Sequence, residues 1–168
     1  MQVHVAKGDL TNLNVDALVN PGNSEGTMRT GVSERIRKAG GDQIEAEAKR
    51  SAPIAIGAAL LTDSGGLQAK KIIHVPIMEA ARGTSTSEEV RRATRAALVA
   101  ASAKQLASIA IPAMGSFGEG VPLDEMARAI VEEVRAHKKD FPTDVYLVDE
   151  RDHIVELLEE SVHGPSSG

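Results

Sequence analysis

Short aliphatic runs alternate with segments of helical periodicity along nearly the whole chain, and this alternation limits the possible folds more than any other feature. Apolar runs of about 4–8 residues, bounded by turn residues, predict strands, and apolar residues three or four positions apart predict helices. We expect strands at residues 3–5, 17–19, 57–62, 71–77, 109–112 and 145–148, and helices at residues 31–39, 42–51, 85–104, 123–137 and 152–161. Such alternation favours a three-layer α/β domain with a mixed or mainly parallel central sheet.

Capping and breaking residues set the expected ends of these elements. Residues 85–88, Ser-Thr-Ser-Glu, offer N-capping groups for the alanine-rich helix expected at 85–104. Asp42 is the expected N-cap of the helix at 42–51. Residues 20–23 read Asn-Pro-Gly-Asn, and we expect the proline and glycine to end the pairing of the strand that begins at Ala17.

The length and composition predict one aliphatic domain. A chain of 168 residues can bury a large core, and we expect a single domain at residues 1–162 followed by a flexible C-terminal tail, His-Gly-Pro-Ser-Ser-Gly, at residues 163–168. With two Phe, one Tyr and no Trp, the core must consist of Ala, Val, Ile and Leu. The lack of cysteine excludes disulfides, thiolate metal ligands and a cysteine nucleophile, and it fits a cytoplasmic protein.

The charge balance makes nucleic acid an unfavourable partner. Nineteen basic and 24 acidic residues give a formal net charge of −5, so long-range attraction to a polyanion is weak. The aliphatic runs are far shorter than the roughly 18–20 residues of a membrane span, and no basic segment precedes an apolar stretch at the N-terminus, so we expect no membrane partner.

Three loops follow expected strands and are candidates for a ligand site. They lie at residues 7–10, 20–31 and 114–120, and ligands of α/β sheets bind beyond the carboxyl ends of the strands. The third loop has Gly115, Gly118 and Gly120 between a strand and a helix, which lets backbone amides approach an anion. We interpret it as a phosphate cradle, although glycines needed only for a tight turn would explain it equally well. It is neither a P-loop nor a dinucleotide fingerprint.

Four segments taken together resemble the macro domain family. They read VAKGDLT, DALVNPGN, TGVSERIRKAGG and IPAMGSFGEGVPLD, and their order and spacing match over about residues 2–161. The resemblance implies a three-layer α/β/α macro domain-like fold with a mixed, about six-stranded central sheet. It also implies binding of ADP-ribose without a cofactor or metal, and in some members hydrolysis of O-acetyl-ADP-ribose or of ADP-ribose linked to protein.

The resemblance also implies the site residues. The ligand contacts would come from Asp9, Leu10, Asn20, Asn23, Gly31, Val32, Ser33, Gly115, Ser116, Phe117, Gly118, Glu119 and Gly120. Asp9 matches the adenine-binding aspartate, whose alternative role is to cap a turn with Thr11. Asn20 and Asn23 are also the catalytic candidates, because the family's asparagines line the ribose end of the cleft and Asn23 matches the one that can position a water. Their alternative role is to close a turn.

The sequence departs from the family pattern at several positions. Residues 24–31, SEGTMRTG, replace a run of glycines, so the cleft is expected to be narrower or its loop differently shaped. Arg29 either pairs with a phosphate there or is an exposed arginine. Ser33 stands where hydrolytic relatives often have aspartate, and a serine cannot act as a carboxylate base. The aromatic residue on which adenine stacks is replaced near Asp149 or Glu150.

One further residue invites a catalytic interpretation. His74 lies between apolar residues, where a histidine is more often a hydrogen-bonded core residue than a catalyst. The histidines at 4, 74, 137 and 153 lack metal-ligand spacing, and no Ser-His-Asp set can be assigned.

Three functions therefore compete. The first is binding of ADP-ribose or a related metabolite. The second is hydrolysis of O-acetyl-ADP-ribose or of mono-ADP-ribosylated protein, with Asn23 positioning water. The third, binding of nucleic acid or poly-ADP-ribose, is the weakest because the chain is acidic and has few aromatic residues.

Overall fold

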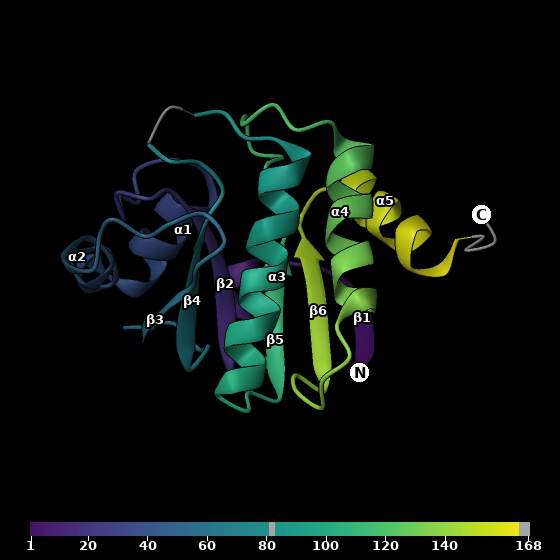
Figure 1. Cartoon of the computed structure of the whole chain (residues 1–168), viewed down its shortest axis with the longest axis horizontal. Coiled ribbons are helices and arrows are strands. Elements are labelled where there is room, and N and C mark those ends of the chain that lie inside the picture. The colour runs from purple at the N-terminus through teal and green to yellow at the C-terminus, as the bar shows by residue number, and fades with distance from the viewer. Residues whose placement is uncertain (81–82, 165–168) are drawn as a thin grey trace.

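The computed structural model describes residues 1–80 and 83–164, and within them six strands form one mixed sheet. The strands, in chain order, are β1 (Gln2–Lys7), β2 (Ala17–Gly22), β3 (Leu60–Asp63), β4 (Lys71–Pro76), β5 (Ser108–Pro112) and β6 (Asp144–Asp149). Their spatial order is β1-β6-β5-β2-β4-β3, and every neighbouring pair is parallel except β3 with β4 (Figure 1). The predicted mixed sheet is confirmed.

Helices cover both faces of the sheet, which completes the predicted three layers. One face carries α3 (Ser87–Ala103), α4 (Leu123–Ala136) and α5 (Asp152–His163). The other carries α1 (Gly31–Gly40), the neighbouring α2 (Asp42–Arg50) and the 3-10 turn η1 (Leu10–Asn12). Figure 1 shows α3 and α4 side by side in front of the strands.

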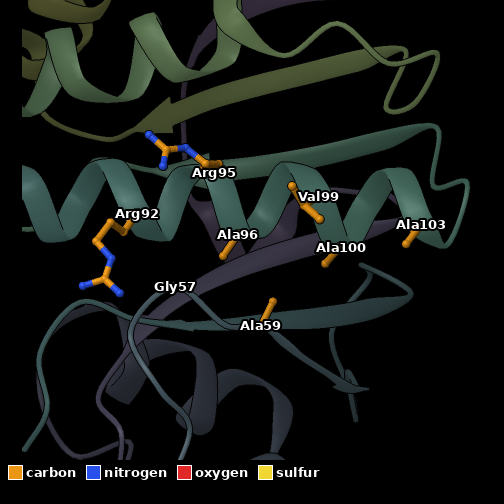
Figure 2. A pocket seen from close by; sticks show the side chains of 8 residues that line it. All are labelled: Gly57, Ala59, Arg92, Arg95, Ala96, Val99, Ala100 and Ala103. Atoms are coloured by element: carbon orange, nitrogen blue, oxygen red, sulfur yellow. The ribbon is translucent and has the colours of Figure 1, made fainter.

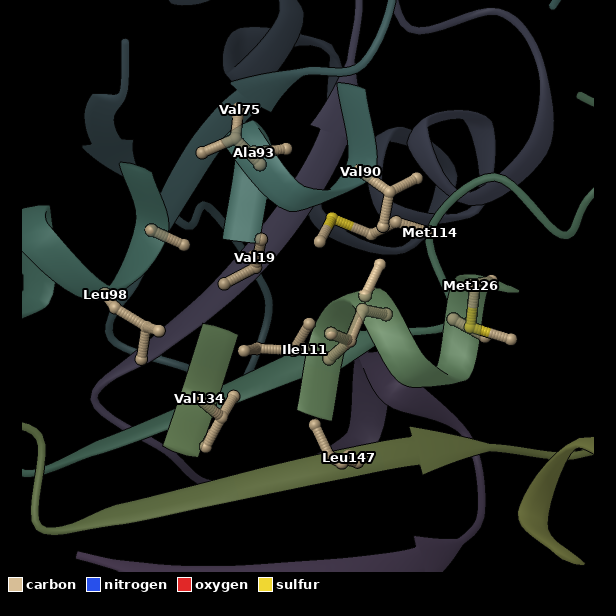
Figure 3. Packing of buried hydrophobic residues seen from close by; sticks show 14 of the residues in the cluster. Val19, Val75, Val90, Ala93, Leu98, Ile111, Met114, Met126, Val134 and Leu147 are labelled. Carbon is tan, nitrogen blue, oxygen red and sulfur yellow. The ribbon is translucent and has the colours of Figure 1, made fainter. Parts of the chain in front are cut away.

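The central strands β2, β4 and β5 are largely apolar because both of their faces are buried. In β2, Ala17 and Val19 join the core under α3 and α4, whereas Leu18 joins the core under α1. Period-2 alternation therefore directs successive residues to two different cores. Figure 3 shows the first core, where strand residues such as Ile111 and Leu147 pack against Val134 and other helix residues.

Some predicted ends are shifted. The strand β2 does not stop at Val19, as expected, but continues through Asn20 and Pro21 to Gly22, in parallel register with β4. Its pairing with β5 covers Ala17 and Leu18, so Pro21 lies beyond the part of β2 where a missing N–H would interrupt that ladder. The strand expected at 57–62 begins later, at Leu60, because a turn closed by Ala58 N donating to Ala55 O (3.0 Å) precedes it.

The helix caps also differ from expectation in one case. Thr86 caps α3 as predicted, accepting from Glu89 N at 3.2 Å. The N-cap of α2 is Gly41 rather than Asp42, because Gly41 at φ +111° makes the turn out of α1 and the helix begins with Asp42. At the C-terminus, α5 extends to His163, and residues 165–168 of the expected tail lie outside the described residues.

The parallel strands place the loops together. The carboxyl ends of β1, β2, β4, β5 and β6 all lie at one edge of the sheet, so the segments after them meet there. In the described part of the chain, no helix is both long and apolar enough to cross a membrane.

Candidate ligand-binding site

Two loops face each other at the carboxyl edge of the sheet. We define the first loop as residues 23–31, between β2 and α1, and the second loop as residues 113–120, between β5 and α4. They touch at Gly31, where a Cβ would lie 3.6 Å from Phe117 Cβ and 3.2 Å from Glu119 Oε2. Gly31 has φ +56°, so a residue without a side chain suits both its conformation and this close approach.

Asn23 holds the start of the first loop. Its Nδ2 donates to Thr27 Oγ1 at 2.8 Å, and its Oδ1 accepts from Glu25 N at 3.0 Å. This is the turn-closing role given above as the alternative. Asn23 nevertheless lines the cleft between the loops together with Thr27.

The end of the first loop is anchored by Glu45 on α2. This buried carboxylate accepts from Met28 N at 2.7 Å and from Arg29 Nη2 at 2.6 Å and Nε at 3.0 Å. Burial acts to raise the pKa of Glu45, but the bonds from Arg29 and Met28 outweigh it and hold the pKa below its ordinary value. The guanidinium of Arg29 is therefore paired with the carboxylate of Glu45. In this structure its partner is that carboxylate and not the ligand phosphate considered from the sequence.

Asn20 lies behind the cleft, inside a buried polar chain. Its Nδ2 lies 3.0 Å from His74 Nδ1, and its Oδ1 accepts from Ser33 Oγ at 2.8 Å. Asn20, Ser33 and His74 are 1%, 5% and 3% exposed, so the chain links β2, α1 and β4 below the loops. Ser33 stands at the position where an aspartate would be expected in a hydrolytic relative. Here its hydroxyl orients the Asn20 side chain, and the position supplies no carboxylate.

The same series of hydrogen bonds defines the tautomer of the His74 imidazole. Thr62 Oγ1 donates to Asp63 O at 3.1 Å and lies 2.8 Å from His74 Nε2, so the hydroxyl accepts from an Nε2–H. Nδ1 then carries the lone pair that accepts from Asn20. Burial lowers the pKa of His74 to about 4, so the imidazole is neutral at pH 7. The interpretation of His74 as a hydrogen-bonded core residue agrees with this geometry.

Asp9 lies at the end of β1, in a polar cluster. Its Oδ1 accepts from Thr11 N at 2.9 Å, from Thr11 Oγ1 at 2.8 Å and from Arg35 Nη2 at 3.3 Å. Arg35 also pairs with Glu150 Oε1 at 3.2 Å. Burial acts to raise the pKa of Asp9, but Thr11 and the charge of Arg35 hold it below its ordinary value. The carboxylate is thus ionised at neutral pH and caps η1, as the alternative role predicted.

The second loop contributes Phe117 and Glu119 to the lining of the cleft, and its glycines Gly115 and Gly118 differ in burial. Gly115 (φ +87°) is buried against Val121, where a Cβ would lie 2.5 Å from Val121 Cγ2. Gly118 (φ +93°) is exposed, and a Cβ there would have no described atom within 4 Å. Phe117 lines the cleft, whereas Val121 belongs to the core under α3 and α4.

Arg151 braces the second loop from the end of β6. It bonds Asp149 through Nε and Nη2, each at 2.8 Å, and it donates from Nη1 to Ser116 O at 2.9 Å and from Nη2 to Ser116 Oγ at 2.8 Å. Its guanidinium lies 4.3 Å from the centre of the Phe117 ring. Next to Asp149 and Glu150, where the family pattern has an aromatic residue for adenine stacking, this protein therefore has Arg151, which stacks on Phe117.

The cleft between the loops is nearly closed. It has a volume of about 20 Å³, enough for about one water molecule, and its lining includes Asn23, Ser33, Phe117 and Glu119. A larger hollow of about 490 Å³ lies elsewhere, between α3 and residues 57–59 (Figure 2). Alanines and Val99 form much of its wall, and its lining residues come from neither the first nor the second loop.

The structure brings five of the predicted residues together in the lining of the cleft: Asn23, Val32, Ser33, Phe117 and Glu119. Val32 also packs in the core under α1, whereas Leu10 lies in that core and does not line the cleft. Sequence reasoning missed Arg35, Glu45 and Arg151, whose partners are distant in sequence, apart from Asp149. The one available signal was Asp149-Glu150-Arg151 directly after an apolar strand, at the expected ligand edge.

The fold and loops define a three-layer α/β domain with a candidate ligand cleft at the carboxyl edge of its sheet. A family model described as Macro domain matches residues 19–130, and the chain belongs to the macro domain family.

Three of its sequence relatives carry the description uncharacterized protein. One from Aquifex aeolicus is 44% identical over 159 residues, which cover 95% of this chain and 96% of that protein. One from Aeropyrum pernix is 40% identical over 74% of this chain and 66% of that protein. One from Mycobacterium tuberculosis strain H37Rv is 35% identical over 82% of this chain, but the match spans 38% of that longer protein.

Solved macrodomains share the fold. A variant of the Oceanobacillus iheyensis macrodomain with ADP-ribose bound superposes with a TM-score of 0.83 at 21% identity, covering 94% of this chain and 90% of that one. The Trypanosoma brucei macrodomain in complex with ADP-ribose gives a TM-score of 0.84 at 20% identity, covering 96% of this chain and 69% of that one.

Proposed function

We propose that this protein binds ADP-ribose or a related ADP-ribose metabolite in the cleft between the first and second loops. The observation that carries the proposal is the juxtaposition of Gly31 with Phe117 and Glu119, which brings two glycine-containing loops together at the carboxyl edge of a parallel sheet. Backbone amides in that position suit an anionic ligand, and the diphosphate of ADP-ribose is such an anion. The solved macrodomains with ADP-ribose support the choice of ligand.

Asp9 supports an adenine at the β1 end of the cleft. The three contacts described above all involve Oδ1, so Oδ2 is the oxygen proposed to accept from the exocyclic amine of adenine. The carboxylate is held ionised by Thr11 and Arg35, which keeps it an acceptor at neutral pH. Guanine presents a carbonyl at the equivalent position and would face the carboxylate with a second acceptor.

We place binding ahead of hydrolysis of O-acetyl-ADP-ribose or ADP-ribosylated protein. The amide of Asn23, proposed to position a reacting water, already bonds Thr27 and Glu25, and Ser33 supplies a hydroxyl in place of a carboxylate base. For Asn23 to hold a water, the turn at residues 23–27 would have to rearrange.

Calorimetric titration with ADP-ribose, with AMP and GDP as controls, tests the proposal. Saturable binding of ADP-ribose, at least tenfold tighter than of either control, is the expected result. Equal affinity for GDP and ADP-ribose would contradict adenine recognition, and absence of binding by calorimetry and by a second equilibrium method would overturn the proposed ligand. If binding is found, release of acetate from O-acetyl-ADP-ribose then separates a binding module from a hydrolase.

A further inference from the structure

Glu119 directs a carboxylate into the place where the proposed function puts a diphosphate. Its Oε1 accepts from Phe117 N at 2.8 Å, so a backbone amide of the cradle already bonds an anion. Its Oε2 lies 3.2 Å from the position that a Cβ on Gly31 would take, so the same carboxylate reaches the first loop. One side chain therefore spans the narrow cleft from the second loop to the first.

The backbone of Glu119 is anchored while its side chain spans the cleft. Ser85 N donates to Glu119 O at 3.0 Å, and Ser85 Oγ donates to Ile77 O at 2.6 Å, which ties this part of the second loop to the segment after β4. Rotation about the side-chain bonds of Glu119 is enough to vacate the Phe117 amide. The loop itself does not need to unfold.

The chemistry of the cradle explains the fit. Backbone N–H groups of a glycine loop bind anions in general, and a carboxylate and a phosphate both present oxygens that accept charge-assisted hydrogen bonds. The guanidinium of Arg151 lies over the Phe117 ring, and its positive charge interacts with the carboxylate of Glu119. The Phe117 amide can therefore donate to a phosphate oxygen as well as to the Glu119 carboxylate. It cannot donate to both at the same time.

We propose that Glu119 is an internal competitor that occupies the diphosphate position and must be displaced when ligand binds. The inference rests on the proposed function and adds a control of affinity at the same site. The apparent dissociation constant of a ligand rises as the fraction of protein in the competent state falls. Glu119 thus lowers affinity for ligands with a diphosphate and leaves ligands without phosphate nearly unaffected.

The test compares Glu119→Gln and Glu119→Ala with the wild-type protein. Glutamine keeps the size and removes the charge, and alanine removes the side chain. Glu156→Gln, at an exposed position on α5, is the control for the change in net charge. We expect both Glu119 variants to bind ADP-ribose about five- to tenfold more tightly than wild type and Glu156→Gln, with adenosine affinity unchanged. Unchanged or weaker ADP-ribose binding by folded Glu119 variants would overturn the inference.

A second probe separates this inference from the proposed ligand. If neither wild type nor variants bind ADP-ribose, the proposed function fails, and inorganic pyrophosphate is titrated while the amide resonances of Phe117 and Gly118 are followed by NMR. We expect these resonances to shift at several-fold lower pyrophosphate in Glu119→Gln than in wild type. Shifts at the same concentration, or no shift in either protein, would show that Glu119 does not compete for this position.

Discussion

Asn20 on β2 and His74 on β4 are register partners in adjacent parallel strands, and their side chains meet with Asn20 Nδ2 3.0 Å from His74 Nδ1. The bond continues through Thr62 on one side and Ser33 on the other. A buried chain of this kind has one consistent pattern of donors and acceptors, so it fixes the neutral form of the histidine and the orientation of the amide. The strand end from which the first loop departs is thereby held in place.

The protein should lose stability in mild acid through His74. Its pKa is lowered from 6.5 to about 4 in the folded protein, so the unfolded chain binds more protons between these values and the stabilisation is lost as pH falls from 6.5 toward 4. For this shift, the free energy of unfolding should fall by about 2–3 kcal/mol between pH 7.5 and 4.5. Urea denaturation measures it, with His74→Gln as the control.

The variant isolates the histidine because His74→Gln leaves the acidic groups, such as Asp9 and Glu45, unchanged. The pH dependence of the variant should be flatter than that of the wild type by the amount given above. Parallel curves for the two proteins would show that His74 is not the titrating group.

Asp9→Asn should weaken ADP-ribose binding while keeping the fold. The asparagine carbonyl can still accept from Thr11, but the amide nitrogen replaces the oxygen proposed to accept from adenine. Loss of a hydrogen bond to a charged acceptor predicts a decrease in affinity of about 10- to 100-fold. Calorimetry checks it, and wild-type affinity in the variant would remove Asp9 from the site.

Gly118→Leu should block the cradle. Gly118 is exposed with φ +93°, so leucine introduces both backbone strain and bulk next to the Phe117 amide. Gly41→Leu is the matched control, since Gly41 has φ +111° and lies at the junction of α1 and α2. Both variants should lose about 1–2 kcal/mol of stability, but affinity for ADP-ribose should fall at least tenfold in Gly118→Leu alone. Equal affinities would argue against the cradle.

Arg151→Ala should destabilise the protein more than removal of an exposed ion pair. The carboxylate of Asp149 is 3% exposed, and loss of Arg151 leaves it without its bidentate partner. We expect a loss of about 2–3 kcal/mol, compared with less than about 1 kcal/mol for Arg128→Ala, whose pair with Asp124 is exposed. Chemical denaturation of both variants measures the two losses of unfolding free energy. Equal losses would show that Arg151 does not brace the second loop.

Local patterns in the sequence predicted the elements well, because residues such as Leu18 and Ile111 lie in short aliphatic runs whose two faces are both buried. The end of β2 was predicted wrongly at Val19 instead of Gly22. Proline is tolerated at position 21 because the pairing of β2 with β5 has already ended there, although the pairing with β4 continues. The candidate site was likewise predictable only in part. The loops were predictable from their glycines, whereas the partners of Arg29 and Arg151 depend on contacts between segments, which a local pattern does not contain.

Mapping ADP-ribose onto the backbone amides by NMR is the most direct test of the proposed binding site. Saturating ADP-ribose is expected to shift the resonances of Asp9, Gly31, Phe117 and Gly118, at the edge where β1, β2 and β5 end. Shifts confined to the hollow beside α3, at residues such as Gly57, Val99 and Ala103, with those four resonances unchanged, would contradict it.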